Sequence, residues 1–134
     1  SWLMLHTEVL TSIQLGLKLN IILVDNGGFG CIHRLQEECG IPEFGNLLIN
    51  SNMDFEMNAK SYGCIVNKVN SIEELSQILE ENKKVDRTCV TIINTDPNIS
   101  SPGYAWWDVA IPEVSTLENV NEKYNIYSQK ILKK

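Results

Sequence analysis

The residues best suited to chemistry in this sequence form the segment DNGGFG at positions 25–30. An uninterrupted apolar run, IILV, leads directly into Asp25 and Asn26, and three glycines follow. Such a run is typical of a parallel strand covered on both faces, and parallel α/β sheets bind ligands beyond the carboxyl ends of their strands. The segment therefore predicts either a ligand site or a strand-to-helix turn that simply requires glycine.

Phosphate is the first ligand that the glycines suggest. Glycine lets a ligand approach the backbone closely, and the backbone N–H groups at a helix N-terminus attract anions. Two common phosphate motifs do not fit. The sequence has no Gly-Lys pair, which a Walker A loop needs, and a G-x-G-x-x-G fingerprint starting at Gly28 has His33 in place of its third glycine. A Walker A loop is thus excluded, and an ordinary dinucleotide site is disfavoured.

Magnesium is the second ligand that the segment suggests. Mg²⁺ takes oxygen ligands and can bridge a protein to a diphosphate. Asn26 offers a side-chain oxygen, and Gly28, two residues further on, offers a backbone carbonyl. A third ligand, ideally a carboxylate, would have to come from another strand end. These two residues are therefore the candidate metal ligands.

The cysteines do not form a zinc site pattern. None of them belongs to a C-x-x-C pair, and only two histidines are present to assist. Scattered cysteines in a chain with a real core are typical of reduced, mostly buried thiols in a cytoplasmic protein. This expectation covers all four cysteines, Cys31, Cys39, Cys64 and Cys89.

Composition restricts the class of protein. The 134 residues are 43% hydrophobic, which suits one compact domain without an internal boundary. A formal net charge of −6 repels phosphate backbones, so nucleic acid is disfavoured as a partner. No apolar run approaches the roughly 20 residues that span a bilayer, and the start lacks a signal peptide's basic region. Because the chain begins with Ser1 rather than Met, we expect a fragment of a longer protein.

Helical and strand patterns alternate along the chain. Asp54 is placed to cap one helix, and Ser71 with Glu74 forms a capping box that opens another. Such alternation predicts an α/β fold, with a mainly parallel sheet and helices on both of its faces in three layers. The predicted helices cover residues 7–16, 31–40, 55–63, 72–84 and 117–131, and the strands cover residues 20–26, 64–69 and 88–96.

These elements together resemble the thiamine-diphosphate-dependent enzymes. That family carries a Gly-Asp-Gly motif, then roughly two dozen or more residues, then a pair usually written Asn-Asn. Ser1 matches the residue that often follows Gly-Asp-Gly, Asn26 matches the last Asn, and Gly28 matches the carbonyl position. Asp25 departs from the usual first Asn, a position that does not bind metal. The stretch MDFEMNAKSYG at 53–63 also resembles the family's helix after the cofactor loop.

The resemblance implies that residues 1–134 are the C-terminal, diphosphate-binding domain. Asn26 and Gly28 would bind Mg²⁺, and the diphosphate of the cofactor, thiamine diphosphate, would contact the other site residues, Ser1, Gly27, Gly28, Phe29, Gly30 and Cys31. The family's metal-binding Asp and activating Glu fall outside this chain, the latter in another domain, usually from a second subunit. We therefore expect a homo-oligomeric parent protein and an isolated chain that has no catalytic residue, is inactive and binds the cofactor weakly.

Two less general stretches, at residues 25–46 and 103–115, resemble the trihydroxycyclohexane-1,2-dione hydrolases of myo-inositol catabolism. The resemblance implies hydrolytic opening of a small cyclic diketone to 5-deoxyglucuronate. Two alternatives remain: an acetolactate synthase-like decarboxylase or carboligase, and a non-catalytic flavodoxin-like module in which DNGGFG is only a turn. His33 is open between a surface position and substrate contact, whereas His6, Trp106 and Trp107 are expected to have packing or surface roles.

Overall fold

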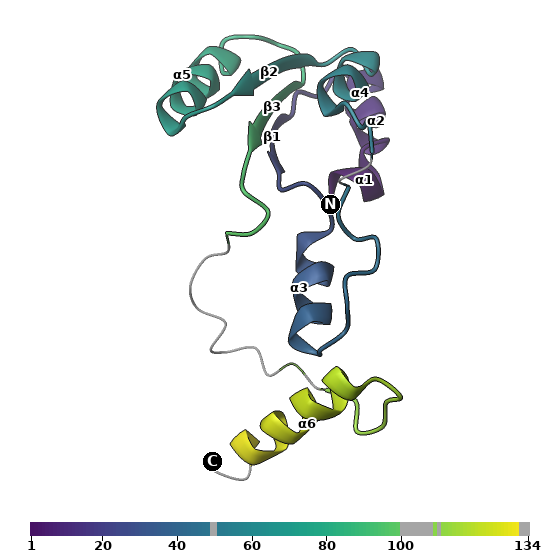
Figure 1. Ribbon diagram of the computed structural model, residues 1–134. Helices are drawn as coiled ribbons and strands as arrows, with labels where there is room; N and C mark the ends of the chain where they lie inside the picture. The colour runs from purple at the N-terminus through teal and green to yellow at the C-terminus, as the bar shows by residue number, and fades with distance from the viewer. Residues whose placement is uncertain (49–50, 100–108, 110, 132–134) are drawn as a thin grey trace. The chain divides into compact units, whose positions relative to one another are not determined.

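The computed structural model describes residues 1–48, 51–99, 109 and 111–131. Trp106 and Trp107 lie outside these residues. The helices are α1 (Trp2–Leu5), α2 (Glu8–Gln14), α3 (Gly30–Glu38), α4 (Phe55–Ser61), α5 (Ile72–Asn82) and α6 (Glu118–Ile131) (Figure 1). The strands are β1 (Asn20–Asp25), β2 (Ile65–Val69) and β3 (Cys89–Asn94).

The residues group into two compact units. The first comprises Ser1–Asn26 and Ser51–Asp96, and it holds all three strands with α1, α2, α4 and α5. The second comprises Gly27–Asn50 and Pro97–Lys134, and it holds α3 and α6. The expectation of one domain over residues 1–134 stays a prediction.

The sheet of the first unit is parallel, with the order β1-β3-β2 (Figure 1). In its register, Ile21 of β1 and Val66 of β2 both lie opposite Val90 of the central strand β3. Crossover connections join the strands, with α4 before β2 and α5 before β3. The predicted α/β architecture is therefore confirmed.

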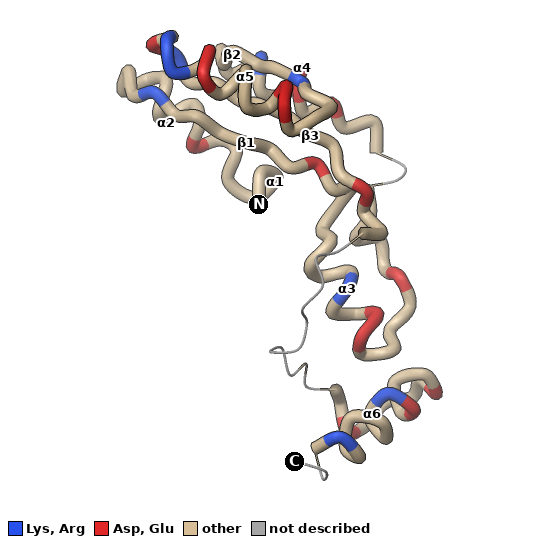
Figure 2. Tube along the Cα trace, turned by 90° about the vertical axis from the view of Figure 1, so that its left-hand side faces the viewer, with Lys and Arg blue, Asp and Glu red and all other residues tan. Residues whose placement is uncertain are grey.

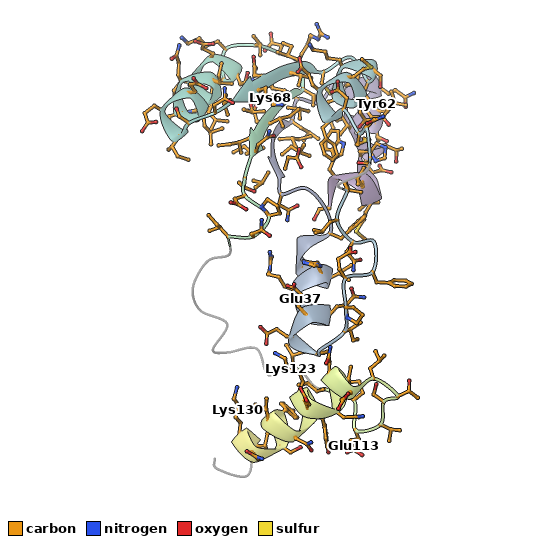
Figure 3. All side chains as sticks on the ribbon, viewed as in Figure 1. Glu37, Tyr62, Lys68, Glu113, Lys123 and Lys130 are labelled. Atoms are coloured by element: carbon orange, nitrogen blue, oxygen red, sulfur yellow. The ribbon has the colours of Figure 1, made fainter. Side chains whose placement is uncertain are left out.

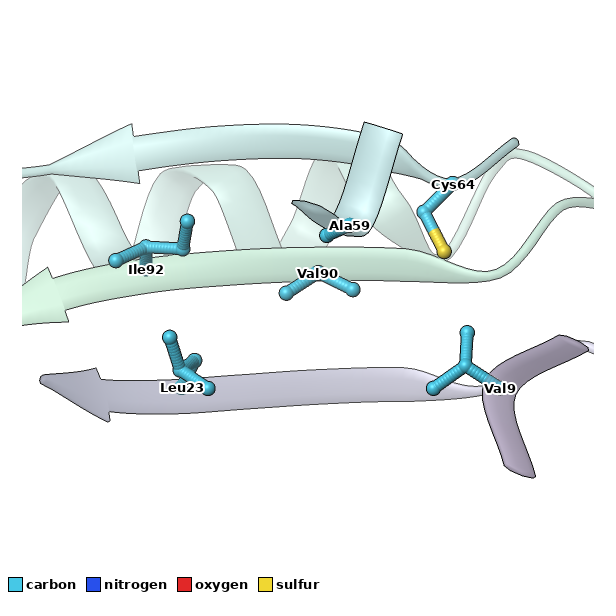
Figure 4. Close-up of a cluster of buried hydrophobic side chains, with 6 residues drawn as sticks. All are labelled: Val9, Leu23, Ala59, Cys64, Val90 and Ile92. Atoms are coloured by element: carbon cyan, nitrogen blue, oxygen red, sulfur yellow. The ribbon is translucent and has the colours of Figure 1, made fainter. Parts of the chain in front are cut away.

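Helices cover both faces of this sheet. Val90 and Ile92 of β3 pack with Leu23, Val9 of α2 and Ala59 of α4 in the buried cluster (Figure 4). Thr91 lies between them in sequence and so points to the opposite face. There the Thr91 hydroxyl accepts a hydrogen bond from the side chain of Asn82, the last residue of α5, at 3.2 Å. The three layers are thus a helix layer with α2 and α4, the sheet, and α5.

The predicted helix caps form, with one difference. The Asp54 carboxylate accepts the Met57 N–H at 2.9 Å, and the Ser71 hydroxyl accepts the Glu74 N–H at 3.1 Å. In a capping box, Glu74 would accept the N–H of Ser71 itself. It accepts the Asn70 N–H at 2.8 Å instead, one residue earlier. The bond from the Glu74 side chain in this capping box is therefore shifted by one residue. Both helices begin where the sequence predicted.

Helix α1 is an element that the sequence patterns did not separate from α2. It is tied to α4 by the Trp2 indole N–H, which donates to the Asn58 side chain at 2.9 Å. The His6 ring lies between Trp2 and Tyr62, with ring centroids 6.0 and 5.9 Å away. His6 thus has the packing role that the sequence favoured.

The second unit places α3 and the start of α6 together. Gly40, just after α3, has φ +78°, and a Cβ there would lie 2.5 Å from the Asn119 carbonyl oxygen of α6. Only glycine fits both the conformation and this close approach. Val120 of α6 is buried, while Glu37, Lys123 and Lys130 carry charge on the two helices (Figure 3).

Lys and Arg residues and Asp and Glu residues occur in both units (Figure 2). The acidic residues of α5, Glu73, Glu74, Glu80 and Glu81, are all exposed, as expected for a solvated helix face. Within the described residues, no helix combines the length and apolar character that crossing a bilayer would require.

Candidate functional site

The first part of the candidate site is the carboxyl end of β1. Asp25 is the last residue of this strand and lies opposite Asn94 in the register with β3. The Asp25 carbonyl accepts the Thr95 N–H at 2.8 Å and the Thr95 hydroxyl at 3.3 Å. Asn26 follows directly and is the last residue of the first unit before the chain enters the second. The strand end is thus held by the neighbouring strand just before the candidate metal ligand.

The second part is the glycine turn, which belongs to the second unit. Gly27 has φ +73°, and its carbonyl accepts the Leu48 N–H at 2.7 Å. The Phe29 N–H donates to the Asn46 carbonyl at 2.8 Å, and Gly28 pairs with Leu47 in an isolated antiparallel bridge. Residues 46–48 therefore form a short backbone brace along the glycine turn.

This brace gives Gly28 a reason to be glycine that does not involve a ligand. A Cβ at Gly28 would lie 2.8 Å from Leu47 Cα and closer still to the Asn46 carbonyl oxygen. The Asn46 side-chain amide donates to Gln36 of α3, and the Asn46 N–H donates to the Glu43 carboxylate at 2.9 Å. The brace is itself anchored to the helix that follows the turn.

Helix α3 begins immediately after the turn. Gly30 is its first residue and is buried, and Cys31 next to it is exposed. The side chain of its N-cap residue, Phe29, makes no capping hydrogen bond. The first N–H groups of a helix have no partner within the helix, and the helix dipole makes them favourable for an anion. The helix has nine residues, so its dipole is well developed.

His33 lies one turn into α3. Its Nε2 is 3.4 Å from Glu37 Oε1, and its Nδ1 is buried without a hydrogen-bond partner in the described part of the chain. Its side chain is only 15% exposed, so His33 does not occupy the open surface position that was one of its two predicted roles. Contact with a substrate stays a prediction.

Ser1, the remaining candidate for contact with the cofactor, lies in the first unit. Ser1 precedes α1, and its carbonyl accepts the Met4 N–H at 3.0 Å. No group of three or more His, Cys, Asp or Glu side chains among the described residues could hold a metal ion. Asn26 and Gly28 offer two oxygen ligands, and Mg²⁺ prefers six-coordinate octahedral geometry, so a site built on them would need further ligands.

The four cysteines are free thiols with different environments. Cys64 and Cys89 are buried, Cys39 is partly buried, and Cys31 is exposed. Burial raises the pKa of the Cys64 and Cys89 thiols, and the nearby Arg87 guanidinium opposes this rise in both. These two thiols favour the neutral form and are therefore core residues rather than nucleophiles.

Comparison with known families now identifies the chain. Residues 1–93 match the family model described as thiamine pyrophosphate enzyme, C-terminal TPP binding domain. The chain belongs to the thiamine pyrophosphate enzymes. The match includes β1, the glycine turn, α3, β2 and β3 as far as Ile93. It therefore covers Asn26 and Gly27–Cys31 and ends just before Asn94 and Thr95.

Curated relatives in this enzyme family have the same printed name, 3D-(3,5/4)-trihydroxycyclohexane-1,2-dione hydrolase. The relative from Bacillus subtilis (strain 168) is 36% identical over 98% of this chain. Those from Bacillus licheniformis and Clostridium tetani are 39% and 36% identical over 92% of it. The chain spans only 20% to 22% of the length of these relatives.

Sequence patterns missed two contributions to the candidate site of this thiamine pyrophosphate enzyme domain. The brace at 46–48 gave no signal, because it pairs through backbone atoms that any residue carries. Thr95 could have been suspected, since it follows the β3 pattern directly and parallel strands end at the same sheet edge. Motif spacing thus located the candidate residues, whereas the contacts that hold them form only when the chain folds.

Proposed function

We propose that residues 25–31 supply part of the diphosphate and magnesium site of a thiamine-diphosphate-dependent hydrolase. The observation that carries this proposal is the family match over residues 1–93. The matched residues include a strand that ends at Asp25, Asn26 directly after it, and a glycine turn that leads into α3. Family membership also speaks against the flavodoxin-like module, because the turn lies within the residues that match a TPP-binding domain.

Asn26 and Gly28 are the proposed magnesium ligands in this chain. An amide oxygen and a backbone carbonyl are hard oxygen donors, which is the set that Mg²⁺ prefers. The donor chemistry therefore fits the metal. The other ligands would be diphosphate oxygens, water and a carboxylate from the Gly-Asp-Gly motif of the parent protein.

The start of α3 is the proposed diphosphate contact. The N–H groups of Gly30 and Cys31 belong to the first turn of the helix, where anions are favourable. The Phe29 N–H already donates to Asn46, so a contact from Phe29 needs another of its atoms. Gly27 and Gly28 would contribute a close backbone approach, and Ser1 a hydroxyl.

Thiamine diphosphate, when bound, supplies an electron sink for cleaving a bond next to a carbonyl group. The residues of this chain bind and orient its diphosphate end.

For the parent protein we propose hydrolysis of the ring C–C bond of trihydroxycyclohexane-1,2-dione to 5-deoxyglucuronate, in the cytoplasm. Its partners would be the other domains of its own chain and a second subunit, because the family's site lies between subunits. This substrate is supported by the names of the relatives, which match 92% to 98% of this chain and are called trihydroxycyclohexane-1,2-dione hydrolases.

The test compares the full-length parent protein with this 134-residue chain. The parent should consume the cyclic dione but not pyruvate, and calorimetry should show Mg²⁺-dependent binding of thiamine diphosphate. Asn26→Ala in the parent should weaken this Mg²⁺-dependent binding at least 10-fold, on the order expected for a lost ligand contact. The chain alone should bind weakly and turn nothing over.

Three results would count against the proposal. Turnover of pyruvate without the dione would favour the acetolactate synthase-like alternative. Unchanged Mg²⁺ dependence in Asn26→Ala would remove the metal assignment. Tight Mg²⁺-dependent cofactor binding by the isolated chain would show that the missing carboxylate and partner domain are not required.

A further inference from the structure

Thr95 holds the backbone immediately before the proposed metal ligand. It is the first residue after β3, and it donates twice to the same oxygen, the Asp25 carbonyl. The N–H bond, at 2.8 Å, continues the pairing of β3 with β1. The hydroxyl bond, at 3.3 Å, is a second contact that depends on the side chain of Thr95.

These bonds orient Asn26 through one peptide unit. The Asp25 carbonyl and the Asn26 N–H belong to the same planar group, so fixing the oxygen also fixes the direction in which Asn26 leaves the strand. Thr95 and Asp25 lie in the same compact unit as Asn26. The side chain of Asn26 therefore starts from a backbone that the neighbouring strand holds.

We propose that Thr95 is a positioning residue for Asn26 in magnesium binding, an inference that rests on the proposed function. It acts through the backbone and does not touch the metal. The contact to Asp25 uses its main-chain carbonyl, which any residue carries. It is therefore compatible with an Asp at a position where the family usually has Asn.

The test uses Thr95→Val in the full-length parent protein, which removes the hydroxyl and keeps the backbone N–H. Because one modest hydrogen bond is lost, the apparent Mg²⁺ dissociation constant at saturating thiamine diphosphate should rise about 2- to 10-fold. Thr95→Ser keeps the hydroxyl and should stay close to wild type. Thr95→Ala, a second variant without the hydroxyl, should behave like Thr95→Val.

Thr11→Val is the matched control. The Thr11 hydroxyl also makes an exposed hydrogen bond of 3.3 Å, to Glu8 on α2, away from the strand ends. This variant should leave the Mg²⁺ dissociation constant unchanged. A second readout needs neither metal nor turnover. In the metal-free parent protein, the N–H of residue 95, which donates to the Asp25 carbonyl, should lose protection from hydrogen exchange in Thr95→Val and Thr95→Ala but not in Thr95→Ser or Thr11→Val.

The inference and the proposed function fail in different ways. If Asn26→Ala weakens Mg²⁺ binding while Thr95→Val and Thr95→Ala bind Mg²⁺ and exchange like wild type, only the positioning role is overturned. If Thr95→Ser binds Mg²⁺ as weakly as Thr95→Val does, the positioning role is also overturned, because loss of the hydroxyl would not be the cause of the weaker binding. Unchanged Mg²⁺ binding in Asn26→Ala would overturn the proposed function itself.

Discussion

At Gly28, the protein backbone occupies the space in which any other residue would carry its Cβ. The Asn46 carbonyl and Leu47 Cα lie against it, as part of the brace along the glycine turn. A glycine-rich turn next to a phosphate site is often explained by the approach of the ligand alone. Here the fold requires Gly28 whether or not the cofactor is bound.

We therefore predict that Gly28→Ala disturbs the turn in the absence of cofactor. The added methyl group clashes with backbone atoms that cannot rotate away, at a cost of about 1–3 kcal/mol in the free energy of unfolding. The Phe29 and Leu48 amides, which donate to Asn46 and Gly27, should exchange faster with solvent. Amide hydrogen exchange followed by NMR measures this effect.

Gly45→Ala is the control for this prediction. Gly45 has φ +69°, and no atom of the described residues lies within 4 Å of an added Cβ. The substitution therefore strains the local backbone by about 1–2 kcal/mol without a clash among these residues. Exchange at Phe29 and Leu48 should remain slow. Equal acceleration in both variants would mean that the brace does not hold the turn.

At the scale of the element, α5 shows how local sequence fixes a helix start. The Ser71 hydroxyl and the Glu74 carboxylate satisfy N–H groups on either side of the helix entry. At the other end, the Asn82 side chain bonds to Thr91 on β3 and its carbonyl accepts from Lys18. The helix start is thus defined by neighbours in sequence, and its end is defined by the sheet.

Two serines of α5 give opposite predictions. Ser71→Ala removes the cap and should lower the free energy of unfolding by about 1 kcal/mol. Ser76 lies inside the helix, where its hydroxyl donates back to the Ile72 carbonyl at 2.9 Å. Because Ala is the better helix former, Ser76→Ala should be neutral or stabilising by a few tenths of a kcal/mol. Urea unfolding followed by circular dichroism compares the two, and equal destabilisation would contradict the capping role.

At the scale of the whole molecule, the sheet and its buried cluster belong to the first unit alone. The first unit consists of two segments, Ser1–Asn26 and Ser51–Asp96, and residues 27–50 between them belong to the second unit. The net charge of −6 is a property of the complete chain and, as in the sequence analysis, disfavours nucleic acid as a partner. The unit that contains the sheet is thus built from two separate segments of the chain.

We predict that a chain ending at Asp96 keeps the fold of the first unit. The truncation removes Trp106 and Trp107 and leaves Trp2 as the only tryptophan. The Trp2 indole bonds to Asn58, so its fluorescence reports the packing of α1 on α4. Urea should produce one cooperative change in this fluorescence. A gradual change without a transition would show that residues after Asp96 are needed for the sheet to form.

The sequence by itself determined the order of elements, the helix caps at Asp54 and Ser71, and the candidate ligands Asn26 and Gly28. Periodicity, capping and motif spacing are local, so they are readable without coordinates. Only the tertiary structure decided that residues 46–48 brace the glycine turn, that Thr95 holds the Asp25 carbonyl, and that the chain forms two units. The brace joins backbone groups about 20 residues apart, and backbone groups are the same in every residue, so no pattern of side chains predicts it. The Thr95 hydroxyl is a side chain, but its partner is a backbone carbonyl 70 residues away, which only the pairing of β1 with β3 brings near.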